Sequence, residues 1–109
     1  MRLYRSKYGA KKTEVDGIVF DSKKEAGRYQ ELILMGHAGE IGALLLQPRY
    51  KLYVNKKLIC TYRGDFFYFD RKTQGEVVEE VKGFMTRDAA IKIKLFTALY
   101  PEVELRVIK

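Results

Sequence analysis

The chain has 109 residues, 47% of them hydrophobic, and this length permits one domain with a real core but is too short for two. Its 21 lysines and arginines outnumber its 14 aspartates and glutamates, which gives a formal net charge of +7 at pH 7. An excess of this size favours a polyanionic partner over an acidic or neutral one, and nucleic acid is the first candidate.

The cysteine content and the apolar runs of the chain disfavour a disulfide- or zinc-stapled protein and a membrane protein. Cys60 is the only cysteine, so we expect neither an intrachain disulfide nor a thiolate zinc site. The longest apolar runs, such as residues 43–46, are far too short to cross a membrane, and no apolar signal segment follows the basic N-terminus. We therefore expect a cytoplasmic protein without a membrane partner.

Residues 1–12 are predicted to form a basic arm, because they contain no acidic residue. The arm either remains a solvated terminus or grips DNA phosphates and becomes ordered on them. Its cationic residues are Arg2, Arg5, Lys7, Lys11 and Lys12. Residues 13–109 are predicted to form a single domain.

Local signals predict a hairpin and a helix after the arm. Asp16-Gly17 is a dipeptide that readily adopts positive φ, and it predicts two short strands within residues 13–20. Ser22-Lys-Lys-Glu25 has the spacing of a capping box and predicts a helix over residues 23–37.

The middle of the chain is predicted to be extended. Residues 44–54 suit a strand in which Pro48 requires an edge position or a bend. Residues 58–70 and 77–82 are rich in β-branched and aromatic side chains, and we expect them to form adjacent antiparallel strands.

A second helix and a last strand are predicted near the C-terminus. Thr86 suits the N-cap of a helix over residues 87–99, and residues 103–108 suit a strand. The helix positions expected to face the sheet are Ile91, Leu95, Ala98 and Leu99. Lys92 and Lys94 each either reach a DNA phosphate or extend from a solvated face.

Three charged side chains are predicted to converge on the two central strands. Side chains alternate between the faces of a strand, so Glu80 and Lys82 point to the same side. Asp65 lies on the preceding predicted strand among apolar neighbours, where a charge is costly unless function requires it. The alternative is that Glu79, Glu80 and Lys82 belong to a solvated edge strand with an ordinary surface ion pair, and that Asp65 opens a turn.

Two neighbouring carboxylates suit Mg²⁺, which binds through one or two carboxylates and keeps several waters. Such an ion polarises a phosphate and lowers the pKa of an attacking water. Lys82 could orient that water or neutralise charge that develops on the phosphate, and the carbonyl of Val81 could complete the metal's shell.

The arrangement over residues 13–108 resembles the PD-(D/E)XK nuclease superfamily, and within it the small phage-borne nucleases of the Holliday-junction-resolvase type. The segments that carry the resemblance are residues 12–26, 47–49, 65–70 and 78–84. The resemblance implies an α/β fold with a restriction-endonuclease-like core, in which helices flank a mixed β-sheet. It also implies Mg²⁺ or Mn²⁺ held by Asp65 and Glu80, with Lys82 as the catalytic lysine.

Three positions bear on this resemblance less directly. Gly64 stands where the superfamily's name has a proline, which is often absent in relatives. Glu25 matches an acid of the first helix that many members add to the catalytic site, although it is equally placed to complete the capping box. Gln47 is similar to an accessory polar residue of some sites, with a β-ladder side chain as the alternative.

The implied activity is the hydrolysis of branched DNA, such as four-way junctions, by a homodimer that makes paired cuts, in the host cytoplasm if the protein is phage-encoded. Two alternatives share the fold, namely a restriction-like or RecB-like nuclease for duplexes or ends and a non-catalytic DNA-binding module. A third is an RNA-binding protein that stacks bases on exposed aromatic side chains of residues 66–69.

Overall fold

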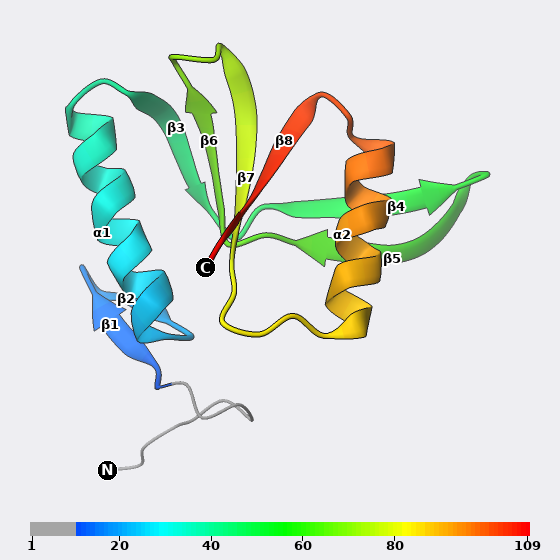
Figure 1. Ribbon diagram of the computed structural model, residues 1–109, viewed down its shortest axis with the longest axis horizontal. Coiled ribbons are helices and arrows are strands. Elements are labelled where there is room, and N and C mark those ends of the chain that lie inside the picture. Colours follow the sequence, from blue (N-terminus) through cyan, green and yellow to red (C-terminus); the bar gives the residue numbers. More distant parts are fainter. Residues whose placement is uncertain (1–10) are drawn as a thin grey trace.

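A mixed sheet separates two helices, one packed on each of its faces (Figure 1). The structure is a computed structural model that describes residues 11–109. Its elements are β1 (Thr13–Val15), β2 (Ile18–Phe20), α1 (Lys23–His37), β3 (Ile41–Leu46), β4 (Arg49–Val54), β5 (Lys57–Arg63), β6 (Phe66–Asp70), β7 (Gly75–Val81), α2 (Arg87–Leu99) and β8 (Val103–Ile108).

The sheet has four strands in the order β3-β6-β7-β8. β6 pairs antiparallel with both β3 and β7, whereas β8 returns through α2 to lie parallel to β7. This crossover makes β7 an inner strand with a neighbour on each side. The predicted α/β fold with a mixed sheet and two helices is confirmed.

Two hairpins lie outside the sheet. β1 and β2 pack beside α1, and the Asp16-Gly17 turn between them has the predicted positive φ values of 54° and 77°. β4 and β5 pack against α2 and extend away from the sheet, to the right in Figure 1. The predicted break at Pro48 is the point where the chain leaves β3 for this hairpin.

Both helices begin at side-chain caps that the sequence predicted. Ser22 Oγ accepts a hydrogen bond of 3.1 Å from the backbone N–H of Glu25, and Thr86 Oγ1 accepts one of 3.1 Å from that of Ala89. These caps satisfy backbone donors that a helix N-terminus leaves without partners. Neither helix of residues 11–109 is long and apolar enough to cross a membrane.

The predicted buried face of α2 is wrong at three of its four positions, because only Leu95 packs, partly buried, against the core, whereas Ile91, Ala98 and Leu99 are exposed. Ile91 is 65% exposed and Leu99 is 37% exposed, whereas Phe96 is completely buried. The Phe96 ring lies 4.7 Å from that of Tyr50 and 4.8 Å from that of Tyr62, between centroids. These tyrosines belong to the β4–β5 hairpin, so the hairpin and not the sheet alone sets the rotation of α2.

The predicted strand over residues 58–70 is two strands, β5 and β6, in different sheets. The break at Gly64 faces the break at Pro48, because the Gly64 N–H donates to the Pro48 carbonyl at 2.9 Å. The chain therefore leaves the main sheet and returns to it at one place. Asp65 lies in the bend before β6, and not within a strand as predicted.

We expect Gly64→Ala to destabilise the fold by about 1 to 3 kcal/mol, because overpacking a tight site has this cost. A Cβ atom at Gly64 would lie only 2.6 Å from Val78 Cγ1. Gly27→Ala is the matched control, because a Cβ there meets nothing within 4 Å and a helical Gly-to-Ala change stabilises by about 0.5 to 1 kcal/mol. Urea unfolding of both variants decides the matter, and equal stabilities would contradict the close packing at Gly64.

Candidate active site

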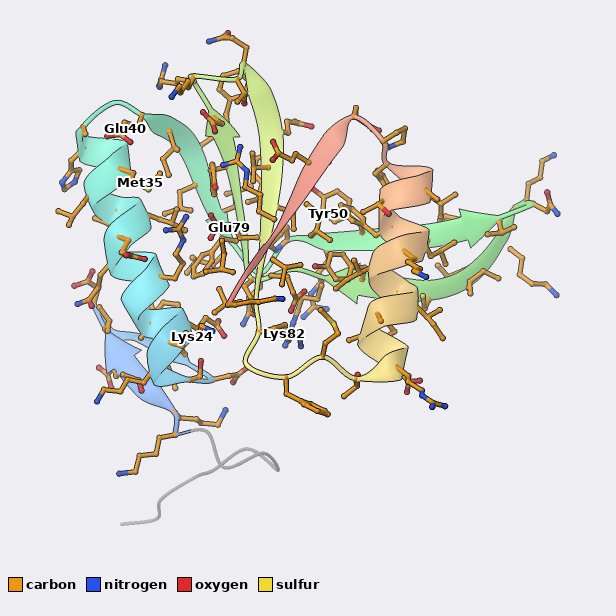
Figure 2. All side chains as sticks on the ribbon, viewed as in Figure 1. Lys24, Met35, Glu40, Tyr50, Glu79 and Lys82 are labelled. Carbon is orange, nitrogen blue, oxygen red and sulfur yellow. The ribbon has the colours of Figure 1, made fainter. Side chains whose placement is uncertain are left out.

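The end of β7 and the bend before β6 form one side of a pocket of about 590 Å³, which we name the carboxylate pocket. Its lining includes Asp21, Glu25, Arg63, Asp65, Glu80 and Lys82. The predicted convergence of Asp65, Glu80 and Lys82 is thus present in the structure, and Glu25 joins them from the first turn of α1. Lys82 lies where the chain leaves β7, at the lower end of the strand in Figure 2.

Asp65 is held against the end of β7 by the backbone. Its Oδ2 accepts a hydrogen bond of 2.6 Å from the N–H of Val81, and its own N–H donates to the Glu79 carbonyl at 2.9 Å. Both partners are backbone groups of β7, so the backbone of this strand, and not a flexible side chain, fixes the position of Asp65.

Glu80 is 5% exposed and points to the α2 side of the sheet. Its Oε1 accepts a hydrogen bond of 2.5 Å from the Tyr62 hydroxyl, and its Oε2 lies 3.4 Å from Lys82 Nζ. The predicted same-side placement of Glu80 and Lys82 is therefore confirmed. The Lys82 side chain is one-third exposed, so its ammonium group can meet a ligand.

Two carboxyl groups of the pocket, those of Asp65 and Glu25, have raised pKa values. Burial and the charge of Glu80 raise the pKa of Asp65 from 3.8 to about 6, although the Val81 N–H and the charge of Lys82 oppose the change. Burial and the charge of Asp65 raise the pKa of Glu25 from 4.5 to about 7. Like charges that repel in a half-buried pocket favour a bound proton or a bound cation.

Asp65 and Glu80 are the side chains of this pocket that fit a hard divalent cation. Within residues 11–109, no three carboxylate, imidazole or thiol groups form a ready metal cluster. Mg²⁺ requires only one or two protein carboxylates, and it completes its shell with water, carbonyl or phosphate oxygens. The two carboxylates meet that requirement, and the backbone carbonyl of Val81, which also lines the pocket, is an available further ligand.

The other predicted site residues lie apart from the carboxylate pocket. Gln47 is exposed between β3 and β4 with a φ of 53°, and only its backbone N–H reaches Asp65, at the carbonyl. Lys94 is exposed on α2, whereas Lys92 lines a neighbouring pocket. Gln47 therefore lacks the position of an accessory side chain in this pocket.

The predicted basic arm is described only at its end. Lys11 is exposed, and Lys12 Nζ lies 3.1 Å from Asp21 Oδ1. The predicted DNA contacts Arg2, Arg5 and Lys7 lie outside the described residues. The arm's role in DNA binding remains a prediction.

Sequence reasoning missed the burial of Glu79, which was expected on a solvated strand in the alternative interpretation. Its side chain is completely buried, and Arg28 donates to both carboxylate oxygens at 2.8 and 2.6 Å. The Tyr68 hydroxyl donates a third hydrogen bond at 2.6 Å. Figure 2 shows Glu79 between α1 and the sheet. The predicted strand-helix-strand order carried a signal for this burial. Such a crossover places its first strand, here β7, beside a parallel partner, so β7 is not an edge strand.

The aromatic run that an RNA-binding interpretation requires is not an exposed platform. Phe66 and Tyr68 are completely buried, and Phe67 and Phe69 are half-buried. Bases stack on accessible ring faces, so these residues serve the core instead.

The fold and the pocket define an α/β protein with a carboxylate-rich site at the end of β7, one of the two inner strands of its sheet. The family model described as "Protein of unknown function (DUF1064)" matches residues 5–109, and the chain belongs to this family. No curated protein and no solved structure is significantly similar to the chain. The function must therefore be argued from the site itself.

We expect Glu79→Leu to destabilise the fold by about 3 to 5 kcal/mol, because it leaves the mostly buried Arg28 guanidinium without its buried partner and with only the exposed Glu31. Arg28→Met combined with Glu79→Leu should cost clearly less, since it removes both charges. Glu31→Gln is the control, because Glu31 pairs with the same arginine at an exposed position. If urea unfolding found the double variant less stable than Glu79→Leu, the ion pair would not be the cause.

The raised pKa values of Asp65 and Glu25 predict that the metal-free fold loses stability as the pH rises. Between the ordinary values near 4 and the raised values of about 6 and 7, the folded protein holds more protons than the unfolded chain, so unfolding becomes easier with pH. The loss should be nearly complete by about pH 8, one unit above the higher of the two raised values. The lowered pKa values of Asp70 and Glu104 act at more acidic pH.

Urea unfolding in EDTA at about pH 5 and pH 8 measures this effect. Asp65→Asn should show a smaller loss between the two pH values than the wild type, and the exposed control Glu14→Gln should behave as the wild type does. An equal loss in Asp65→Asn would show that the carboxylate pocket does not cause the pH dependence.

Proposed function

We propose that this protein is a metal-dependent DNA endonuclease of the PD-(D/E)XK type, with a restriction-endonuclease-like core. The observation that carries the proposal is the convergence of Asp65, Glu80 and Lys82 on one pocket at the end of β7. A pair of carboxylates with a lysine 3.4 Å from one of them is the donor set that the superfamily resemblance implies. The α/β fold with a mixed sheet and two helices is compatible with that core.

Each residue has a distinct part in the proposed hydrolysis. Asp65, Glu80 and the Val81 carbonyl hold Mg²⁺ or Mn²⁺, which when bound polarises the phosphodiester and lowers the pKa of its water. Lys82 orients the attacking water or neutralises the charge that develops on the phosphate. Tyr62 fixes the Glu80 carboxylate through its hydroxyl.

Glu25 is positioned to handle a proton in this reaction. It lines the carboxylate pocket, and a pKa of about 7 allows its carboxyl group to take up or release a proton near neutral pH. Its backbone N–H also completes the α1 cap with Ser22, so the capping and proton-transfer roles are compatible.

The proposed substrate is branched DNA, and the proposed assembly is a homodimer with two sites that make paired cuts. The net charge of +7 supports a polyanionic substrate. Exposed apolar side chains at the end of the β4–β5 hairpin offer surface that a second copy could bury. These side chains are Tyr53, Val54, Leu58 and Ile59.

Cleavage of a labelled four-way junction beside a matched linear duplex, with Mg²⁺ or with EDTA, tests the proposal. The wild type should make paired, metal-dependent cuts in the junction. Asp65→Asn, Glu80→Gln and Lys82→Ala should each lose at least about 100-fold in rate, because each removes a charge from the reacting phosphate's surroundings. Glu14→Gln, an exposed acid on β1, should cut as the wild type does.

The outcomes separate the candidate functions. Cutting of the duplex or of its ends would select the restriction-like or RecB-like alternative with the same site. Tight binding without cutting, at any metal, would select the non-catalytic DNA-binding module and overturn the endonuclease. Metal-dependent cutting that all three variants retain would overturn the assignment of the site.

A further inference from the structure

A second pocket, of about 500 Å³, lies on the α2 side of Glu80 and is rich in positive charge. We name it the basic pocket; its polar lining includes Arg49, Thr61, Arg63, Lys82, Thr86 and Lys92. The four cationic side chains outnumber the acidic ones of the pocket, Glu80 and Asp88. The hollow is therefore suited to an anion.

Arg49 and Arg63 are brought together by an irregularity in the β4–β5 hairpin. Val54 pairs with Lys57 beside the turn, and continued regular pairing from there would place Arg49 opposite Tyr62. The register shift between Leu52 and Tyr53 moves the pairing by one residue, so Arg49 lies directly opposite Arg63. Directly opposed residues of a ladder have side chains on the same face.

Neither arginine forms an ion pair with a carboxylate of the described residues, although Arg63 lies close enough to Glu25 and Asp65 for its charge to oppose the rise of their pKa values. Within residues 11–109, no hydrogen bond or ion pair is formed by the guanidinium of Arg49 or Arg63, whereas Arg28 and Arg106 both bind carboxylates. Like charges directly opposite each other on a sheet destabilise it. An external anion bound by both guanidinium groups would offset the repulsion between Arg49 and Arg63. The planar donors of a guanidinium group suit a phosphate.

The surrounding groups favour the same class of ligand. Thr61 and Thr86 contribute hydroxyl groups, and Thr86 and Ala89 bring the N-terminal turn of the 13-residue helix α2 to the pocket. A helix N-terminus carries partial positive charge. Lys92 adds a further cation from the second turn of α2.

The basic pocket adjoins the carboxylate pocket, since Arg63, Glu80 and Lys82 line both. We propose that Arg49 and Arg63, with Lys92, bind a backbone phosphodiester that neighbours the cleaved one on the same DNA strand. This subsite rests on the proposed nuclease function and adds to it a place for the substrate strand. Arg49 lines the basic pocket but not the carboxylate pocket, and so contributes to strand binding without contact with the reacting phosphate.

DNA binding in EDTA, measured by fluorescence anisotropy over a range of salt concentrations, tests the subsite without turnover. Arg49→Gln combined with Arg63→Gln should weaken binding at least about tenfold and reduce the slope of log K against log salt by about one to two, since each lost phosphate contact contributes about 0.9. Arg49→Lys should keep the slope, because it keeps the charge. Both arginines are exposed, so the fold should survive, and circular dichroism checks this.

Lys57→Gln is the matched control, because it removes one positive charge at the far end of the same hairpin. It should leave the affinity and the slope near the wild-type values. In cleavage assays, Arg49→Gln should raise KM with little change in kcat, the behaviour of a residue that binds the strand away from the reacting phosphate.

The experiment separates failure of the subsite from failure of the nuclease. If the wild type neither binds nor cuts DNA, the proposed function fails and the subsite fails with it. If the wild type does both and the double arginine variant matches it, or loses no more than Lys57→Gln, only the subsite is overturned. Binding of inorganic phosphate that the double variant loses, with DNA binding unchanged, would also overturn it in favour of a site for free phosphate.

Discussion

The bidentate pair between Arg28 and Glu79 joins α1 to the inner strand of the sheet, and the candidate site depends on it. The Glu79 carboxylate is completely buried, and without its three hydrogen bonds it would cost several kcal/mol. Glu25 lies on α1 three residues before Arg28, so the same ion pair that locks the helix also sets the approach of Glu25 to Asp65. The raised pKa of Glu25 is a consequence of this docking, because it arises from burial and from the charge of Asp65.

β7 gives two consecutive glutamates opposite environments. Glu79 points towards α1, where its charge is matched by an arginine and a tyrosine hydroxyl. Glu80 points towards α2, where Tyr62 donates one hydrogen bond to it. Among the described residues, the partly exposed Lys82 is the only cation that forms an ion pair with Glu80. Strand alternation and the inner position of β7 are sufficient to cause this difference. One carboxylate thus stabilises the fold, while the other remains near Asp65 with negative charge that a cation can offset.

The sequence predicted those features that local chemistry determines. Both helices begin at a Ser or Thr cap whose hydrogen bond is to a residue three positions later. The Asp16-Gly17 turn depends only on the dihedral angles of its own two residues. The convergence of Glu80 with Lys82 followed from alternation alone. Features set by distant partners were missed: the rotation of α2 depends on the hairpin tyrosines, and the break at Gly64 depends on its contact with Pro48. The pairing of Arg49 with Arg63 depends on a register shift in the hairpin, and no residue pattern in the hairpin predicts that shift.

The two adjoining pockets have opposite charge, and this has a consequence for the order of binding in the proposed nuclease. In the proposed nuclease, the basic pocket would attract a DNA strand, whereas the carboxylates of Asp65 and Glu80 beside it would repel the neighbouring phosphate. Asp65 and Glu80 would hold a divalent cation, which would offset that repulsion and supply a ligand for the phosphate. Coupling of this kind is reciprocal, so a bound strand must tighten the cation by the same factor by which the cation tightens the strand. Lys82 lines both pockets, and its ammonium lies 3.4 Å from Glu80 Oε2, so in the proposed nuclease it would offset the charge of Glu80 at the boundary between cation and strand.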